Sequence, residues 1–191
     1  MVVLAAGASA RLGKPKQLLV FHGKTLLRNA VDEAAKTNAD AVVAVLGKNA
    51  DLLAKEIDPK RVHIVENKDW EEGMASSVRS GLKTLLQKKP AIDAVIFLIC
   101  DQPFISVSLL NELIATQKKT GKPIVASNYG ETVGPPALLH KKFFSDLMQL
   151  KGDAGARKII QQNSDEVATV LFPRGSIDID TQEDYEALKN L

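Results

Sequence analysis

The sequence predicts an α/β fold in three layers: a Rossmann-like, mostly parallel sheet with helices on both of its faces. Short apolar runs rich in Val and Ile alternate with segments of helical periodicity, which is the order expected of βαβ units. The runs are apolar at successive positions, which is typical of strands that helices cover on two sides. The length of 191 residues suits one ordinary domain. We therefore expect a single domain over residues 1–191.

The apolar runs place the expected strands, and the periodic segments between them place the expected helices. The expected strands are Val2–Ala5, Ala41–Leu46, Val62–Glu66, Ala94–Leu98, Ile124–Ser127 and Val167–Leu171. The expected helices are Thr25–Lys36, Ala50–Ile57, Met74–Gln87, Ser106–Lys119, Lys141–Leu150, Ala154–Gln162 and Gln182–Leu191. Thr181, followed three residues later by Asp184, resembles a capping box at the start of the last helix.

One segment, Tyr129–Leu139, interrupts this alternation. Its two glycines and two prolines make a regular parallel strand unfavourable. We expect a loop or an edge strand near the C-terminal ends of the sheet strands, where open α/β sheets bind ligands. A rigid Gly-Pro-Pro turn at that edge would shape a pocket wall.

The composition excludes several classes of partner and location. The 25 basic and 23 acidic side chains leave a net charge of +2, and the cations are scattered, so we expect no nucleic acid partner. No apolar run reaches the roughly 18 residues of a membrane helix, so we expect no membrane partner. A single cysteine, Cys100, inside an apolar run fits a reducing, cytoplasmic location and a role in packing.

The loop after the first expected strand reads LAAGASARLGKPKQLL from Leu4 to Leu19. Its small residues let the backbone approach a ligand, and the N–H groups of residues 6–10 suit phosphate oxygens. Arg11 and Lys16 would neutralise the phosphate charge, so a nucleoside triphosphate is the natural guest. The loop is neither a Walker A motif nor a dinucleotide fingerprint. Taken alone, it also fits an ordinary strand-to-helix loop with solvated cations.

This string resembles the signature loop of MobA/MocA-type nucleotidyltransferases. Further strings are similar to the same family and follow its order: EGMASSV at 72–78, CDQP at 100–103, GPPA at 134–137, KGDAGAR at 151–157 and DIDT at 178–181. The resemblance implies one nucleotidyltransferase domain with the fold of nucleotide-diphospho-sugar transferases. Two departures are a first strand that starts almost at the signature and a first loop with only Gly7 before Arg11.

Carboxylates mark the expected metal site. Asp101 follows the buried run that ends at Cys100, and an unpaired charge at such a place costs several kcal/mol unless a cation meets it. Mg²⁺ is the expected cofactor. The resemblance makes Asp101 and Asp180 its ligands, and alternation places Asp178 on the same face as Asp180. The alternatives are a helix cap or a turn residue for Asp101 and a helix cap for Asp180.

The resemblance implies transfer of a nucleoside monophosphate from a nucleoside triphosphate to a phosphate-bearing acceptor. Arg11, Lys16 and Asp101 are then the catalytic residues, acting through positioning and electrostatics. The expected nucleotide-binding residues are Leu4, Ala5, Ala6, Gly7, Arg11, Lys16, Asn67, Gly73 and Ser77. The expected acceptor-binding residues are Gly134, Pro135, Pro136, Asp153 and Arg157. Trp70 either stacks on the base or packs against the sheet edge.

The acceptor implied by the resemblance is molybdopterin, and a molybdoenzyme client is a further partner that it allows. The first loop lacks the paired glycines of guanylyl-transferring members, which favours CTP over GTP. Three alternatives stay open: a guanylyltransferase that uses GTP, a nucleotidyltransferase for another phosphorylated acceptor, and a non-catalytic nucleotide-binding or cofactor-binding chaperone. The paired carboxylates argue against the last, because binding alone does not require two metal ligands.

Overall fold

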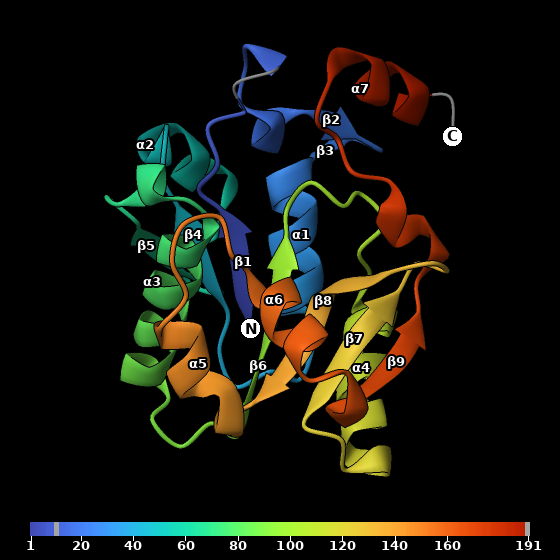
Figure 1. Ribbon diagram of the computed structural model, residues 1–191. Coiled ribbons are helices and arrows are strands. Elements are labelled where there is room, and N and C mark those ends of the chain that lie inside the picture. Colours follow the sequence, from blue (N-terminus) through green and yellow to red (C-terminus); the bar gives the residue numbers. More distant parts are fainter. Residues whose placement is uncertain (10–11, 190–191) are drawn as a thin grey trace.

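A seven-stranded sheet forms the middle layer of the computed structural model, which describes residues 1–9 and 12–189 (Figure 1). Its strand order is β5-β4-β1-β6-β8-β7-β9. The strands are β1 (Val2–Ala5), β4 (Val43–Leu46), β5 (His63–Glu66), β6 (Ala94–Ile99), β7 (Ile124–Asn128), β8 (Val133–His140) and β9 (Val167–Leu171). All neighbours pair in parallel except β8, which runs antiparallel to both β6 and β7. The predicted mostly parallel α/β sheet is confirmed.

Helices cover both faces of this sheet. The α-helices are α1 (Leu26–Ala35), α2 (Ala50–Leu53), α3 (Met74–Lys88), α4 (Val107–Thr120), α5 (Phe144–Met148), α6 (Ala156–Gln162) and α7 (Gln182–Lys189). Short 3-10 turns are η2 (Lys16–Leu18), η3 (Ala54–Glu56), η4 (Trp70–Glu72), η5 (Lys141–Phe143), η6 (Ser164–Glu166) and η7 (Pro173–Ser176). Each predicted helix is present within the described residues, and positions 190–191 of the last one lie outside them. The helix expected at 50–57 is shorter and continues into a 3-10 turn. The helix expected at 141–150 is also shorter and begins with a 3-10 turn.

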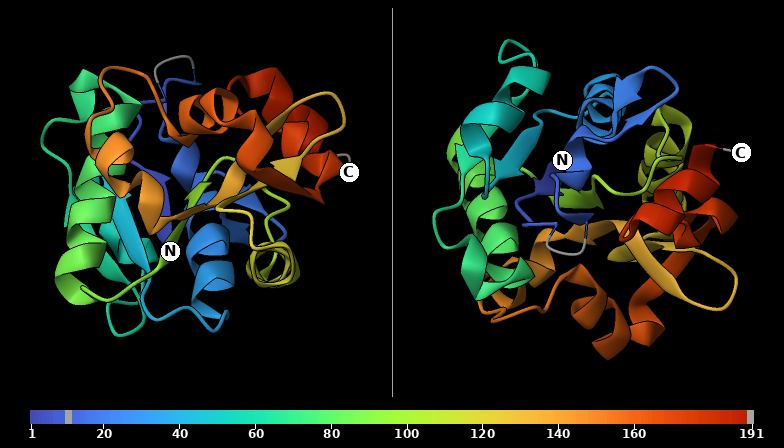
Figure 2. Two further views of the ribbon diagram at one scale, coloured as in Figure 1. Left: turned by 60° about the horizontal axis from the view of Figure 1, so that its bottom comes forward. Right: turned by 90° about the horizontal axis from the view of Figure 1, so that it is seen from above.

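Alternation along the strands divides the core into two layers. The helices that cover them lie on opposite faces of the sheet (Figure 2). Val3 of β1 and Leu98 of β6 pack with α1 and α4 on one face. Val2 of β1 and Phe97 of β6 pack with α3, α5 and α6 on the other face. Successive strand side chains point to opposite faces, so strands that are apolar at every position hold both helical layers at once.

The expectation of a loop or an edge strand over Tyr129–Leu139 is wrong, because β8 lies inside the sheet between β6 and β7. Prolines are tolerated there because Pro135 and Pro136 take no part in the pairing of β8 with its neighbours. Pairing with β6 begins at Ala137, and a bulge opposite Ala126 and Ser127 leaves Pro135 and Pro136 out of register with β7. The N-terminal part of β8 still lies at the C-terminal edge of the parallel strands, as expected.

The last helix folds back over the start of the chain. Tyr185 and Leu188 of α7 pack with Leu19 and Leu26, and the Tyr185 hydroxyl donates a hydrogen bond to the Val20 carbonyl at 2.9 Å. Val20 belongs to a two-stranded ribbon, β2 (Val20–Phe21) with β3 (Lys24–Thr25), that lies beside α7 (Figure 1). This contact brings the segment before α7 to the same sheet edge as the first loop. Within the described part of the chain, every helix is too short or too polar to cross a bilayer.

Candidate functional site

A buried glutamine shapes the loop after β1. The Gln17 side-chain amide donates hydrogen bonds to the carbonyls of Ala5 at 3.0 Å and Gly7 at 2.8 Å, and its oxygen accepts one from the Ser9 hydroxyl at 3.2 Å. Ser9 in turn accepts a hydrogen bond from the Lys16 amide at 2.9 Å. These bonds fold the loop back on itself and fix the position from which the Lys16 side chain leaves. Arg11, the second predicted cation of this loop, lies outside the described residues.

Lys16 lies between the two predicted metal ligands. Its ammonium Nζ is 2.5 Å from Asp101 Oδ2 and 2.9 Å from Asp180 Oδ1. Asp101 follows β6 and Asp180 precedes α7, so residues far apart in sequence meet at the C-terminal edge of the sheet (Figure 1). Burial alone lowers the pKa of Lys16, but the charges and hydrogen bonds of Asp101 and Asp180 outweigh burial and raise that pKa above its ordinary value. Lys16 is therefore a firmly charged cation.

A capping box fixes the backbone at Asp180. The Asp184 carboxylate accepts hydrogen bonds from the amides of Asp180 at 3.0 Å and Thr181 at 2.8 Å. The Thr181 hydroxyl accepts a hydrogen bond from the Asp184 amide at 3.1 Å. The predicted capping box is confirmed. It fixes the backbone next to Asp180 and so sets the direction in which the Asp180 side chain points.

The residues around Lys16 fit a divalent cation. Asp101 Oδ1 is buried and accepts no hydrogen bond from the described residues, although a buried carboxylate oxygen normally has a partner. No cluster of three or more His, Cys, Asp or Glu side chains within residues 1–9 and 12–189 is arranged as a metal cage. Mg²⁺ usually binds through one or two carboxylates together with substrate phosphates and water. The pair of Asp101 and Asp180 therefore suits a Mg²⁺ ion that arrives with a triphosphate.

A cavity of about 360 Å³ opens next to this ion pair. Most of the predicted nucleotide-binding residues line it: Leu4, Ala5, Ala6, Gly7, Lys16, Gly73 and Ser77. Asn67 lies outside the lining. Its buried amide donates hydrogen bonds to the hydroxyls of Ser76 at 2.8 Å and Ser77 at 3.0 Å, so it fixes the first turn of α3. Trp70 also lines the cavity and is half-buried against the core.

Gly73 lines this cavity at the start of α3. Its φ is +111°, and a Cβ at this position would lie 2.6 Å from both Asp153 Oδ1 and the backbone of Gly152. The Ala75 amide donates a hydrogen bond to the Gly152 carbonyl at 2.9 Å. Only glycine suits this conformation and this close approach. The start of α3 is thereby held against the loop that carries Asp153, which lines both cavities.

A second cavity of about 440 Å³ adjoins the first and contains most of the predicted acceptor residues: Gly134, Pro135, Asp153 and Arg157. Pro136 lies outside its lining, and its carbonyl accepts a hydrogen bond from the buried Ser127 hydroxyl at 2.7 Å. Asp178 lines this cavity, and burial, followed by the charge of Asp101, raises the pKa of its carboxyl.

Sequence reasoning missed two groups in this second cavity, Gln102 and Tyr129. Gln102 belongs to the CDQP string, and that position next to Asp101 is the one signal that pointed to it. Tyr129 was expected only as the start of an irregular segment.

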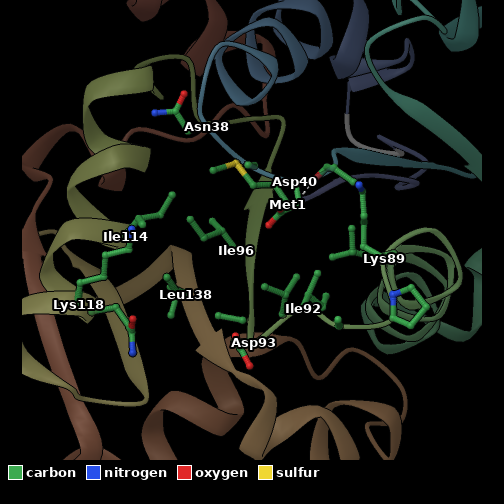
Figure 3. Close-up of a pocket in the computed structure, with 18 residues that line it drawn as sticks. Met1, Asn38, Asp40, Lys89, Ile92, Asp93, Ile96, Ile114, Lys118 and Leu138 are labelled. Carbon is green, nitrogen blue, oxygen red and sulfur yellow. Dashed lines mark hydrogen bonds between the residues drawn. The ribbon is translucent and has the colours of Figure 1, made fainter.

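A further cavity of about 440 Å³ lies at the opposite edge of the sheet, around Met1, Asp93 and Leu138 (Figure 3). Ile92, Ile96, Ile114 and Leu138 form its apolar wall, and Lys89 and Lys118 stand near its rim (Figure 3). None of the predicted site residues lines it. The predicted nucleotide-binding and acceptor-binding residues therefore gather at the other edge, where the parallel strands end.

Comparisons with known proteins identify the family of the chain. The MobA-like NTP transferase domain matches residues 1–167. Nicotine blue oxidoreductase of Paenarthrobacter nicotinovorans is 32% identical over 84% of this chain and 80% of its own length. The purine catabolism protein PucB of Bacillus subtilis is 29% identical over 98% of this chain and 94% of its own. The structure of Rv0371c from Mycobacterium tuberculosis in complex with manganese is 27% identical, with a TM-score of 0.79 over 100% of this chain and 96% of that chain.

Proposed function

Since the chain belongs to the MobA-like NTP transferase domain family and is a nucleotidyltransferase, we propose that its donor is CTP and its acceptor is molybdopterin. The reaction transfers CMP to the terminal phosphate of molybdopterin and releases pyrophosphate. The observation that carries the proposal is the position of Lys16 between Asp101 and Asp180, at the cavity that the phosphate-binding loop lines. In an ordinary solvated loop the lysine would extend into water and would not lie between two partly buried carboxylates.

Asp101 and Asp180 would hold Mg²⁺, which would supply positive charge to offset the charge that develops on the leaving pyrophosphate. Manganese in the Rv0371c complex supports a divalent ion for this fold. Lys16 binds the triphosphate and stabilises the same developing charge from the side of the loop. Its raised pKa keeps the ammonium charged at neutral pH. Removal of one such preorganised group costs about 10²–10³ in kcat in other enzymes.

The nucleotide lies in the first cavity. The small residues from Ala5 to Gly7 allow close approach of the phosphates, and the Gln17 amide keeps that loop in place. The N-terminal turn of α3 presents Gly73 and Ser77 to the base and ribose. The single glycine before Arg11 favours a pyrimidine base.

The acceptor lies in the second cavity, which shares Leu4, Met74, Ile99 and Asp153 with the first. A molybdopterin bound there directs its phosphate toward the boundary between the two cavities. Arg157 supplies positive charge for that phosphate. The phosphate oxygen is already a nucleophile, so the protein needs no activated serine or cysteine, and catalysis rests on orientation of the two substrates.

A transfer assay tests this proposal. The purified protein is incubated with Mg²⁺, molybdopterin and each of the four nucleoside triphosphates, and pyrophosphate release is measured. We expect release with CTP that exceeds release with GTP and depends on molybdopterin. Release with GTP above CTP would overturn the base assignment, and release with a sugar phosphate in place of molybdopterin would overturn the acceptor assignment.

Two matched substitutions test the role of the carboxylates. Asp101→Asn should reduce turnover at least a hundredfold while triphosphate binding is weakened but retained. Asp93→Asn, which removes an exposed carboxylate paired with Lys141 at the opposite edge of the sheet, should leave turnover unchanged. Full activity of the Asp101 variant would remove Asp101 from the mechanism, and a protein that binds CTP without any release would be a binding module.

A further inference from the structure

Trp70 is the only aromatic side chain among the described residues that line the first cavity, and it is the single tryptophan of the chain. The residue is half-buried: part of it packs against the core layer on the α3 face of the sheet, and part stays exposed. Its indole N–H donates to no residue that the structure describes and is not one of the buried groups without a partner, so it is accessible. The protein thus leaves part of a large apolar side chain open at a cavity wall.

The position of Trp70 is fixed by the turn that carries it and by the loop beside it. The turn η4 begins at Trp70, whose carbonyl accepts a hydrogen bond from the Gly73 amide at 3.2 Å. A Cβ at Gly47 would lie 2.8 Å from Trp70 Cβ and 2.9 Å from Ala6 Cβ, so a glycine is needed where these two side chains approach the end of β4. Ala6 and Gly73 both line the first cavity. Trp70 is therefore anchored beside the phosphate-binding loop and at the start of α3.

One face of the indole ring is not covered by the core. Lys48 lies over the ring, with its ammonium Nζ 6.0 Å from the ring centroid. This distance is the outer limit of a cation–π contact. Lys48 is exposed, so its long side chain can move aside. A flat ligand can therefore reach the aromatic face.

Among the parts of a nucleoside triphosphate, the base is the one that suits an open aromatic face. The triphosphate is highly charged and belongs with Lys16 and the metal carboxylates. The ribose carries hydroxyls that an indole face leaves unpaired. A nucleobase is flat, and stacking of a base on an aromatic side chain is favourable for every base. A bare polyphosphate has the charges but no flat ring.

We infer that Trp70 is a specificity-determining residue for the donor: its indole packs against the nucleobase, and this contact makes the first cavity favour a nucleoside triphosphate over a bare polyphosphate. The inference rests on the proposed function in one respect, the placement of the nucleotide in the first cavity. Trp70 then has both of the roles that the sequence allows, since one part of the side chain packs against the core and the exposed part contacts the base.

Calorimetric titrations with a nucleotide and with inorganic tripolyphosphate, each with Mg²⁺ and without an acceptor, test the inference. The wild-type protein should bind the nucleotide more tightly than tripolyphosphate. Trp70→Leu keeps apolar packing against the core but has no aromatic ring, so it should bind the nucleotide roughly tenfold more weakly and tripolyphosphate within about twofold of the wild-type protein. Trp70→Phe restores an aromatic face and should recover most of the lost affinity. Tryptophan emission of the wild-type protein, which comes from Trp70 alone, should be quenched by the nucleotide and unchanged by tripolyphosphate.

Phe144→Leu is the matched control, because Phe144 is half-buried against the same core layer but lines neither cavity. This variant should bind the nucleotide like the wild-type protein, and thermal melting checks that all three variants fold. Equal weakening for both ligands in Trp70→Leu, no weakening for the nucleotide, or emission that the nucleotide leaves unchanged would each overturn the inference. Wild-type binding of the nucleotide no tighter than that of tripolyphosphate would also overturn it.

The titrations use whichever of CTP and GTP binds the wild-type protein more tightly, and transfer to molybdopterin is measured separately. The proposed base and acceptor can therefore fail without deciding the role of Trp70.

Discussion

Replacing Lys16 with Met should increase the affinity of the protein for Mn²⁺ when no nucleotide is present. The ammonium of Lys16 lies 2.5 Å from Asp101 and 2.9 Å from Asp180, the two carboxylates assigned to the metal. A divalent ion that enters this site must displace the ammonium from them. The variant keeps the same two carboxylates but removes the ammonium that lies between them, so an entering ion no longer has to displace Lys16.

The size of the effect follows from the exposure of the three side chains. Exposed ion pairs contribute at most about 1 kcal/mol, whereas breaking a fully buried pair costs about 3–5 kcal/mol. Lys16 and Asp101 are 17% and 14% exposed and Asp180 is 35% exposed, so this cluster lies between the two limits. We therefore expect Lys16→Met to strengthen the free energy of Mn²⁺ binding by about 2 kcal/mol, which corresponds to roughly a 30-fold rise in affinity.

The assay is a titration of the nucleotide-free protein with Mn²⁺, followed by electron paramagnetic resonance of the unbound ion. Lys24→Met is the matched control, since it removes another lysine in a short ion pair, 2.6 Å from Asp32 and outside the lining of either active-site cavity. That control should bind Mn²⁺ like the wild-type protein. The raised pKa of Lys16 keeps the ammonium charged below the ordinary lysine pKa, and the charge is lost only as pH rises through the folded value. The effect should therefore be the same from about pH 6 to pH 9.

Unchanged or weaker Mn²⁺ binding by Lys16→Met would refute this reasoning. It would mean that the ammonium does not occupy the place of the ion, and that Asp101 and Asp180 serve only to hold the loop. An equal rise in Mn²⁺ affinity in Lys24→Met would show that the change in net charge causes the effect and that the position of Lys16 does not.

Three further predictions concern the frame of the site. Cys100 is buried and burial raises the pKa of its thiol to about 12, so a disulfide reagent at pH 8 should label one thiol only after unfolding in urea; rapid labelling of the native protein would contradict this. Gly81→Ala would place a Cβ 2.4 Å from Val2 Cγ1 and 2.9 Å from Val45 Cγ2. The cost of overpacking should exceed the gain in helix propensity, so the free energy of unfolding should fall by about 1 kcal/mol. An unchanged midpoint of urea unfolding would contradict this. Thr181→Ala removes the hydroxyl that accepts from the Asp184 amide and should cost about 1 kcal/mol in urea unfolding, whereas Thr120→Ala, at an exposed helix end, should cost less.

Much of the fold could be predicted because strand composition and helix periodicity are local signals. Val2–Ala5 and the run ending at Leu98 are apolar at every position, and that pattern follows directly from burial on both faces. The antiparallel strand β8 could not be predicted, because its place between β6 and β7 depends on a bulge that hides two prolines from the ladder. A bulge of this kind depends on the neighbouring strand and produces no periodic pattern in the sequence.

The candidate site divides in the same way. Lys16 and Asp101 follow strands whose C-terminal ends lie at one sheet edge, so their proximity follows from topology, and Asp180 joins them through the capping box and the packing of α7. Gln17 lies in the first-loop string and Gln102 in the CDQP string, but neither string indicates what its glutamine contacts. Each acquires its role from the backbone carbonyls that surround it in the folded chain, and those partners come from segments up to 73 positions away.

The most direct test of the account is a crystal structure of the protein with Mn²⁺ and a non-hydrolysable CTP analogue, in which anomalous scattering locates the metal. The prediction is a single strong peak bonded to Asp101, Asp180 and the phosphates, with the Lys16 ammonium moved from between the two carboxylates onto the triphosphate. A metal bound elsewhere, with Lys16 still bridging Asp101 and Asp180 beside a bound nucleotide, would contradict it.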